Sequence, residues 1–257
     1  MARTVLITGA SSGIGRALAL RYAADGGTLG LLGRNLERLE AIAKECRRAG
    51  AGVVIGVMDV RDRAEMMKWI AAFDRNSPVD LVFANAGVME GTRPGGAIEP
   101  PDPAHALIET NVLGVLNTVQ PLLAPMMTRG RGQIAIVSSL AGFVPLPDAP
   151  SYSASKAAML SYGLSLRGLL AERGIGVSVI CPGYITTPMM LRESGVKPFE
   201  MPPEKAVKII RRGLARNKAT IVFPFWFGLS TRISGMLPDR VRRWTMGPFR
   251  FTVSDPK

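Results

Sequence analysis

The chain has 257 residues and a formal net charge of +12 at pH 7, and 47% of its residues are hydrophobic. This composition excludes an intrinsically disordered protein, and no apolar run reaches the ~20 residues that a membrane-spanning helix needs. The two cysteines, Cys46 and Cys181, lie far apart and form no metal-ligand pattern. Because no secretory signal precedes the first predicted strand, we expect a cytoplasmic protein with reduced thiols.

Short aliphatic runs alternate with longer helical patterns along the chain. The predicted strands are Thr4–Thr8, Thr28–Gly33, Val53–Met58, Val79–Ala84, Gln133–Val137, Gly176–Cys181 and Ala219–Phe223. The predicted helices lie near residues 14–25, 35–49, 62–75, 103–129, 151–173 and 203–216. Apolar strands joined by crossover helices indicate a parallel sheet that is buried on both faces. We therefore predict a single α/β domain over residues 1–257, a Rossmann-type doubly wound sheet of seven parallel strands with helices on both faces.

The first predicted strand runs into the turn TGASSGIG at residues 8–15, which opens the first helix. Its glycines are Gly9, Gly13 and Gly15. A tight turn favours residues without a Cβ, and the helix behind it presents unpaired N–H groups to a phosphate. A glycine turn can also simply end a strand, but the strand–turn–helix context favours phosphate binding.

The second predicted strand ends in LLGRN, so that Gly33 is followed by Arg34. In dinucleotide-binding folds an acidic residue near this point binds the ribose 2′-hydroxyl, whereas an arginine accommodates a 2′-phosphate. The planar guanidinium of Arg34 suits a phosphate. We predict NADP(H) as the preferred cofactor; NAD(H) is the alternative if Arg34 is only a solvated loop residue.

The helix predicted from residue 151 places Tyr152 four positions before Lys156, on the same helical face. Free tyrosine has a pKa of about 10, and a nearby ammonium favours the phenolate and lowers that value. General acid–base catalysis works best with a pKa near the working pH. The pair therefore predicts a site where Tyr152 gives a proton to a carbonyl oxygen or takes one from an alcohol.

Taken together, these segments resemble the short-chain dehydrogenase/reductase family. The matching motifs are TGASSGIG at 8–15, DV at 59–60, NAG at 85–87, Asn111 in TNVLG, VSSLAG at 137–142, YSASK at 152–156 and PGYITTP at 182–188. They follow the family's order and spacing over about residues 3–223. Ala84 stands where many members have another asparagine, and Ser12 stands where many NADP-dependent members have a basic residue.

The resemblance implies catalytic roles for Asn111, Ser139, Tyr152 and Lys156. Ser139 would bind the substrate oxygen, Lys156 would bind the nicotinamide ribose, and Asn111 would hold a water that links the lysine to solvent. The expected cofactor-binding residues are Gly9, Ser11, Ser12, Gly13, Ile14, Gly15, Arg34, Asp59, Val60, Asn85, Ala86, Gly87, Tyr152, Lys156, Pro182, Gly183, Ile185 and Thr187.

The substrate side is expected to be apolar. The candidate residues are Phe143, Val144, Leu146, Met189 and Met190, with Leu191 beside them. Residues 184–203 have the length and proline content of a lid, and methionines adapt to irregular apolar shapes. We expect a hydrophobic carbonyl compound or secondary alcohol as substrate; alternatively, these residues only complete the core.

Residues 224–257 form a basic, amphipathic C-terminal extension. From residue 201 onward there are twelve Lys or Arg and three acidic residues, so +9 of the net +12 lies in the last quarter of the chain. The apolar residues in helical spacing are Phe225, Leu229, Ile233, Met236 and Leu237. We expect a helix that covers the substrate cleft or a subunit interface. The alternative is peripheral contact with an anionic membrane surface.

The sequence thus predicts an NADP(H)-dependent oxidoreductase that interconverts a carbonyl and a secondary alcohol on a small-molecule substrate. The alternative is a non-catalytic dinucleotide-binding or sensing module on the same fold. Nucleic-acid binding is not expected, because no RNA- or DNA-binding motif accompanies the charge. The lone His105 suggests no metal site. The resemblance also implies a homodimer or homotetramer.

Overall fold

The computed structural model describes residues 3–246 and 250–254. Seven strands form one parallel sheet in the order β3-β2-β1-β4-β5-β6-β7. The strands are β1 (Arg3–Thr8), β2 (Gly27–Gly33), β3 (Gly52–Val57), β4 (Leu81–Ala84), β5 (Gly132–Val137), β6 (Ile175–Pro182) and β7 (Thr220–Phe223). The strand order reverses between β1 and β4, which is where this doubly wound architecture binds ligands, beyond the carboxyl ends of the strands. The predicted α/β fold is confirmed.

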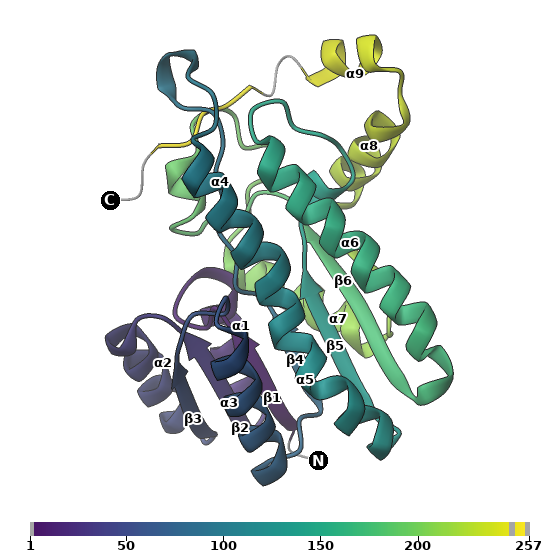
Figure 1. Ribbon diagram of the computed structural model, residues 1–257. Helices are drawn as coiled ribbons and strands as arrows, with labels where there is room; N and C mark the ends of the chain where they lie inside the picture. The colour runs from purple at the N-terminus through teal and green to yellow at the C-terminus, as the bar shows by residue number, and fades with distance from the viewer. Residues whose placement is uncertain (1–2, 247–249, 255–257) are drawn as a thin grey trace.

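Helices cover both faces of the sheet. They are α1 (Gly13–Ala23), α2 (Leu36–Arg48), α3 (Arg63–Asn76), α4 (Pro101–Ile108), α5 (Gly114–Arg129), α6 (Pro150–Leu170), α7 (Pro203–Ala215), α8 (Phe225–Met236) and α9 (Asp239–Met246). Short helical turns are η1 (Pro94–Gly96), η2 (Glu109–Leu113), η3 (Leu140–Gly142), η4 (Ala171–Arg173) and η5 (Met190–Arg192). Figure 1 shows α3, α5 and α6 in front of the sheet, whereas α1 and α7 pack together behind it.

The central strands are mainly apolar because both of their faces are buried, whereas β3, at the edge of the sheet, is partly exposed. In β1, Val5 and Ile7 pack into a core with α1, α2 and α7, whereas Leu6 packs into a second core with α3, α5 and α6. This division follows from the alternation of side chains along a strand. Each fully buried aliphatic side chain contributes about 1.5–3 kcal/mol to folding. The two cores hold the strand ends, and therefore the loops that follow them, in fixed positions.

The prediction of one uninterrupted helix over residues 103–129 is wrong in one respect. The structure divides it into α4, the π-helical turn η2 and α5. The wider turn accommodates Asn111, whose amide is buried and bonded to the backbone of Val88. An extra residue in a helical turn rotates the side chains that follow it, and such turns are frequent at functional sites.

Helices α8 and α9 lie at the top of the molecule, as viewed in Figure 1. Helix α8 follows β7 and packs against η3, which confirms the helix expected in this region. Beyond α9, Val253 pairs with Glu193 as an isolated antiparallel bridge. The chain end thus returns to the segment that follows β6. Among the described residues, none of the helices combines the length and apolar character needed to cross a membrane.

Candidate functional site

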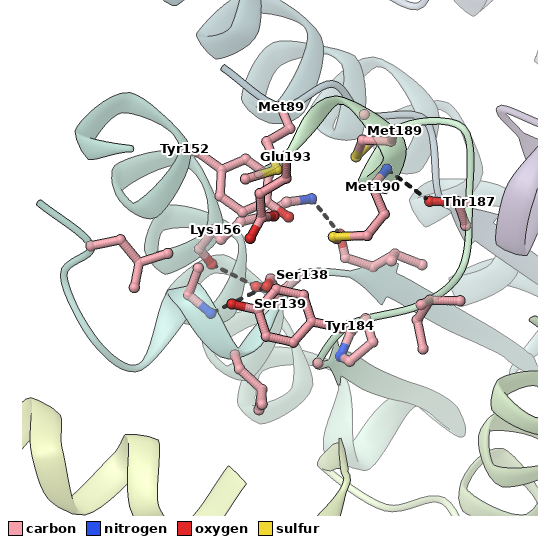
Figure 2. Close-up of a pocket in the computed structure, with 18 of the residues that line it drawn as sticks. Met89, Ser138, Ser139, Tyr152, Lys156, Tyr184, Thr187, Met189, Met190 and Glu193 are labelled. Carbon is pink, nitrogen blue, oxygen red and sulfur yellow. Dashed lines mark hydrogen bonds between the residues drawn. The ribbon is translucent and has the colours of Figure 1, made fainter. Parts of the chain in front are cut away.

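A cavity of about 640 Å³ lies where the loops after β1, β4, β5 and β6 meet. Helix α6 contributes Tyr152 and Lys156 to its lining, and α8 contributes Phe227 and Thr231 on another side. Figure 2 shows many of the lining side chains. The location is the one that the strand order predicts for a ligand site.

The glycine turn between β1 and α1 lines one side of this cavity. Gly9 and Gly13 both have positive φ angles, +66° and +52°, which side chains other than hydrogen disfavour. Ser12 is the N-cap residue of α1, but its side chain makes no capping hydrogen bond to the described residues. By contrast, Asn35 caps α2 and Asp62 caps α3 through their side chains. The N-terminus of α1 therefore keeps N–H groups available for an anion.

The loop after β4 is bonded to the end of β1. The Thr8 hydroxyl accepts hydrogen bonds from the N–H groups of Asn85 and Ala86, each at 3.1 Å. The Asn85 side chain donates to the Thr8 carbonyl at 2.9 Å. A Cβ on Gly15 would overlap the Gly9 carbonyl oxygen and would lie 2.6 Å from Asn85 Nδ2. The sequence thus keeps α1, β1 and this loop close together around the glycine turn.

Arg34 lies beyond the end of β2, where its side chain is 66% exposed and its Nη1 is 3.8 Å from Asp59 Oδ2. Ser11 also reaches this edge, since its Oγ would be 3.4 Å from a Cβ on Gly33. Arg38, which the sequence reasoning missed, lines a shallow hollow with Ser11. Its signal in the sequence was its place in the first turn of the helix that follows Arg34. Arg16 lines the same hollow, so guanidinium groups of Arg16, Arg34 and Arg38 lie at this end of the crevice.

Asp59 and Val60 follow β3 on the same side. Asp59 forms a 2.9 Å ion pair with Arg61. The Val60 carbonyl accepts a 2.9 Å hydrogen bond from the buried Asn117 side chain. Within the described chain, five of the predicted cofactor residues lie outside the lining of the main cavity. These are Ser11, Gly15, Arg34, Asp59 and Val60.

Three predicted catalytic side chains meet at the centre of the cavity. Tyr152 lies in the first turn of α6, and the Ser139 hydroxyl after β5 hydrogen-bonds to its oxygen. Lys156 Nζ lies 5.5 Å from the centroid of the Tyr152 ring and donates to the Val137 carbonyl at 3.2 Å. Figure 2 shows the three side chains facing the same space.

The expected lowering of the Tyr152 pKa is not what the structure gives. Burial raises the pKa of Tyr152 to about 12, the hydrogen bond from Ser139 opposes this rise, and the negative charge of Glu193 adds to it. Burial also lowers the pKa of Lys156 to about 8. The ammonium lies over the ring rather than at the hydroxyl, so desolvation decides the direction for Tyr152.

Asn111 and Lys156 both approach Gly87 on the side where a Cβ would lie. Its Oδ1 accepts from the Val88 N–H at 2.8 Å, and its Nδ2 donates to the Val88 carbonyl at 2.9 Å. A Cβ on Gly87 would lie 3.1 Å from Asn111 Oδ1 and 3.6 Å from Lys156 Nζ. The absence of a side chain at Gly87 therefore leaves space beside both the amide and the ammonium.

The segment after β6 passes over the glycine turn. Pro182 ends β6, and Gly183 and Ile185 line the cavity beside it. Thr187 Cγ2 would lie 3.0 Å from a Cβ on Gly13. The structure therefore brings the two ends of the predicted cofactor set, residues 9–14 and 182–187, into contact.

The predicted substrate side needs one correction. Val144, Leu146, Met189 and Met190 line the cavity. Phe143 is absent from the lining formed by the described residues, because its ring packs near Leu140 and beneath the Arg232 guanidinium, 4.5 Å from its centroid. Leu191, the residue after Met190 in the chain, is 76% exposed.

Several lining residues were missed by the sequence reasoning. They are Met89 after β4, Tyr184 and Glu193 after β6, Phe227 in α8 and Phe251 near the chain end. Sequence spacing gave no signal for Phe251, because it is held at the cavity by contacts between distant segments, among them the pairing of Val253 with Glu193 and the hydrogen bond from its own N–H to Asp148. Glu193 is the only one of these five that carries a charge, and it is 5% exposed.

Comparison with known proteins gives a consistent result. The model of a family described as short chain dehydrogenase matches residues 3–195. An uncharacterized oxidoreductase of Myxococcus xanthus is 37% identical over 238 residues, which cover 92% of this chain and 93% of that protein. The structure resembles a short-chain dehydrogenase from Sphingobium yanoikuyae in complex with NADPH, with a TM-score of 0.79 and 26% identity over 96% of each chain. It also resembles a 3-oxoacyl-[acyl-carrier protein] reductase with bound NAD from Brucella melitensis, with a TM-score of 0.74 and 26% identity over 86% of this chain and 89% of that one.

Proposed function

Because the chain belongs to the short-chain dehydrogenase family of oxidoreductases, we propose that it interconverts a carbonyl and a secondary alcohol on an apolar substrate, with NADP(H) as the preferred cofactor. The observation that carries this proposal is the meeting of Tyr152, Ser139 and Lys156 in one cavity with the open N-terminus of α1. The same cavity therefore contains the side chains proposed for proton transfer and the helix terminus proposed for dinucleotide binding.

The residues around the crevice fit a dinucleotide. Gly9, Ser12, Gly13 and Ile14 would bind its phosphates at the start of α1, where N–H groups are available. The loop with Asn85, Ala86 and Gly87 would bind the adenosine ribose, and Asp59 and Val60 would flank the adenine. Pro182, Gly183, Ile185 and Thr187 would contact the nicotinamide end. When bound, the cofactor supplies or accepts the hydride.

The chain's own residues would then transfer the proton. Ser139 would hold the substrate oxygen, since its hydroxyl already bonds to the Tyr152 oxygen at the same point. Tyr152 would donate its proton to that oxygen during reduction. Its high pKa means that the phenol carries a proton at neutral pH, as a donor must. Lys156 would bind the nicotinamide ribose, and Asn111 would hold a water between the lysine and solvent.

The preference for an apolar substrate rests on the outer part of the cavity. Its walls there are built largely from Val144, Leu146, Met189, Met190 and Phe227. We propose that residues 184–203 act as a lid over this part, because they cross from β6 past the glycine turn to α7. A hydrophobic ketone or aldehyde would remove these side chains from water when it binds.

The test is a screen for consumption of NADPH with carbonyl compounds of increasing apolar size. We expect turnover of aryl and long-chain ketones to exceed that of small polar carbonyls by at least about tenfold, the effect of burying two further methylene groups. Turnover confined to small polar carbonyls would contradict the substrate class. Cofactor binding without turnover of any carbonyl would favour the alternative of a non-catalytic dinucleotide-binding module.

Changing Arg34 to Asp should reverse the cofactor preference. The substitution removes the guanidinium proposed to bind the 2′-phosphate and adds a carboxylate that repels it, so affinity for NADPH should fall about 10- to 100-fold relative to NADH. Affinities measured by fluorescence titration of both cofactors check this. The matched control is Arg48→Asp, an equal charge change at an exposed position at the other end of α2. An unchanged ratio in Arg34→Asp would refute the role of Arg34.

The rate of alcohol oxidation should rise continuously from pH 7 to pH 10. Oxidation needs the Tyr152 phenolate, and below a pKa of about 12 the phenolate fraction increases about tenfold per pH unit. Ser139 and Glu193 act on the pKa of Tyr152. Lys156 lies over the ring, and because its pKa is about 8 it loses its charge within this range, which does not favour the phenolate and so does not produce an early plateau. Single-turnover oxidation of a secondary alcohol measured across this range checks the prediction. A plateau beginning below pH 8 would show instead that the ammonium lowers the pKa of the phenol in the complex.

A further inference from the structure

Glu193 is a carboxyl group buried in an otherwise apolar part of the cavity. It is 5% exposed, and nearby lining residues include Met89, Met190 and Phe251. Figure 2 shows its side chain beside Tyr152. The burial of a carboxylate is costly unless hydrogen bonds or an opposite charge compensate it. A residue of this kind in a substrate cavity needs an explanation beyond packing.

The backbone around Glu193 is fixed from two sides. Glu193 pairs with Val253 as an antiparallel bridge, and the Ser254 N–H donates to the Arg192 carbonyl at 2.9 Å. The Arg192 side chain points elsewhere, to form a 2.9 Å ion pair with the buried Glu90. The orientation of Glu193 into the cavity is therefore set by the loop after β4 and by the chain end together.

The surroundings of the carboxyl group only partly compensate its burial. The Tyr184 hydroxyl donates a hydrogen bond to it, and the positive charge of Lys197 acts on it. Lys197 Nζ, however, donates to the Met190 carbonyl at 2.8 Å. Within residues 3–246 and 250–254, no Lys or Arg forms an ion pair with Glu193, and burial raises its pKa to about 7. The carboxyl oxygens thus retain capacity to accept a further hydrogen bond.

The hydrogen bond that the Glu193 carboxyl group still lacks would come from a group on the substrate. Glu193 acts electrostatically on the Tyr152 phenol, so it is close to the point where the carbonyl oxygen would bind. The Tyr184 hydroxyl already gives its one proton to Glu193, so the carboxyl oxygens are left to accept from a ligand. A substrate hydroxyl can donate to them and remains neutral in the apolar cavity, whereas an ammonium would bring a second buried charge. We propose that Glu193, oriented by Tyr184, is a specificity-determining residue that binds a hydroxyl group on the substrate.

This inference rests on the proposed function and narrows its substrate class to apolar carbonyl compounds that carry a hydroxyl near the carbonyl. A second buried oxygen supports a polar group in the ligand. Ser234 Oγ, in α8 on the lining of the same cavity, has no hydrogen-bond partner among the described residues. The cavity thus has polar contacts at a few fixed points on an apolar surface, which is the usual basis of specificity in small-molecule sites.

The experiment compares matched ketones in the wild-type enzyme and in two variants. The probes are acetophenone, 2-hydroxyacetophenone, 4′-hydroxyacetophenone and 2-aminoacetophenone, assayed with NADPH. In the wild type, kcat/KM for 2-hydroxyacetophenone should exceed that for acetophenone about 10- to 100-fold, the effect of a hydrogen bond to a charged group. The hydroxyl of 4′-hydroxyacetophenone lies far from the carbonyl, so this probe should show no such gain. Glu193→Leu should reduce the ratio of kcat/KM for the hydroxylated probe to that for acetophenone to about 1. The ratio is the readout, because loss of the Glu193 charge also acts on Tyr152 with every probe. Glu193→Gln keeps an acceptor oxygen and should retain part of the preference.

Glu200→Leu is the matched control, because Glu200 lies exposed on the same segment. Melting temperatures establish that each variant is folded, and saturation-transfer NMR measures binding of the probes without turnover. Equal losses with all four probes in a folded Glu193→Leu enzyme would overturn the inference and leave the proposed function intact. A preference for the amine over both hydroxylated probes would also overturn it. Absence of any NADPH-dependent reduction by the wild type would refute the proposed function, and the inference would fall with it.

Discussion

Replacing Tyr152 with phenylalanine should lower kcat for NADPH-dependent carbonyl reduction by about 10²–10⁴-fold, the usual contribution of a positioned general acid. The substitution removes one hydroxyl group and keeps the ring. That ring packs with Met89, Ala149 and Phe251, so the fold and the shape of the cavity should persist. Affinity for NADPH should change by less than about threefold, because the proposed phosphate contacts lie at the start of α1.

The control for this variant is Tyr162→Phe. Tyr162 is in the same helix α6, but its ring packs into the core with α3 and α5, away from the cavity lining of the described residues. Its loss of a hydroxyl should leave kcat unchanged. Steady-state kinetics and fluorescence titration with NADPH compare the two variants directly. A Tyr152→Phe enzyme with at least half of the wild-type kcat would show that another group supplies the proton.

The sequence predicted the central part of the site because that part depends on short, local patterns. The turn at residues 8–15 combines a buried strand, three glycines and a helix start, and all of these are visible in one stretch of sequence. Tyr152 and Lys156 share one helix, so their relative position follows from helical geometry. Ser139, which the family resemblance implied, lies beside Tyr152 and Lys156 in the structure. The reason is that β5, next to β6 in the sheet, ends beside the start of α6.

The direction of the Tyr152 pKa was mispredicted because it depends on burial rather than on spacing. Helical periodicity places Lys156 near the ring, and the structure bears this out with 5.5 Å to the centroid. Helical periodicity does not reveal how little water reaches the Tyr152 hydroxyl. Nor does it reveal that Glu193, forty-one residues further along the chain, adds a negative charge nearby. Both effects favour the neutral phenol and outweigh the contact with Ser139.

The outer wall of the cavity could not be predicted for a related reason. Phe251 reaches it because Val253 pairs with Glu193 and because the Phe251 N–H bonds to Asp148, and such contacts between distant segments have no local signature. Helix α8 was predicted from its apolar spacing, but that spacing did not show which side faces the cavity. In the structure Phe227 and Thr231 line the cavity, whereas Trp226 is 75% exposed. Residues 247–249 and 255–257 of the predicted extension lie outside the described residues.

Replacing Gly15 with alanine should weaken both cofactor binding and the fold. A Cβ at this position would overlap the Gly9 carbonyl oxygen and approach Asn85 Nδ2 to 2.6 Å, so α1 must shift away from β1. Overpacking of this kind costs about 1–3 kcal/mol, which corresponds to about 2–12 °C in melting temperature for a chain of this size. Because the proposed phosphate site is formed by the same turn, affinity for NADPH should fall at least about tenfold, a loss of about 1.4 kcal/mol.

The matched control, Gly168→Ala, separates this effect from a general intolerance of glycine replacement. Gly168 is exposed in α6, and a Cβ there would meet none of the described atoms within 4 Å. Alanine at an unhindered helical position should instead stabilise the protein by about 0.5–1 kcal/mol. Thermal unfolding and NADPH titration of both variants check the pair of predictions. If Gly15→Ala bound NADPH as tightly as the wild type, the close approach of α1 to β1 would not be what forms the phosphate site, and that site would have to be sought elsewhere along the crevice.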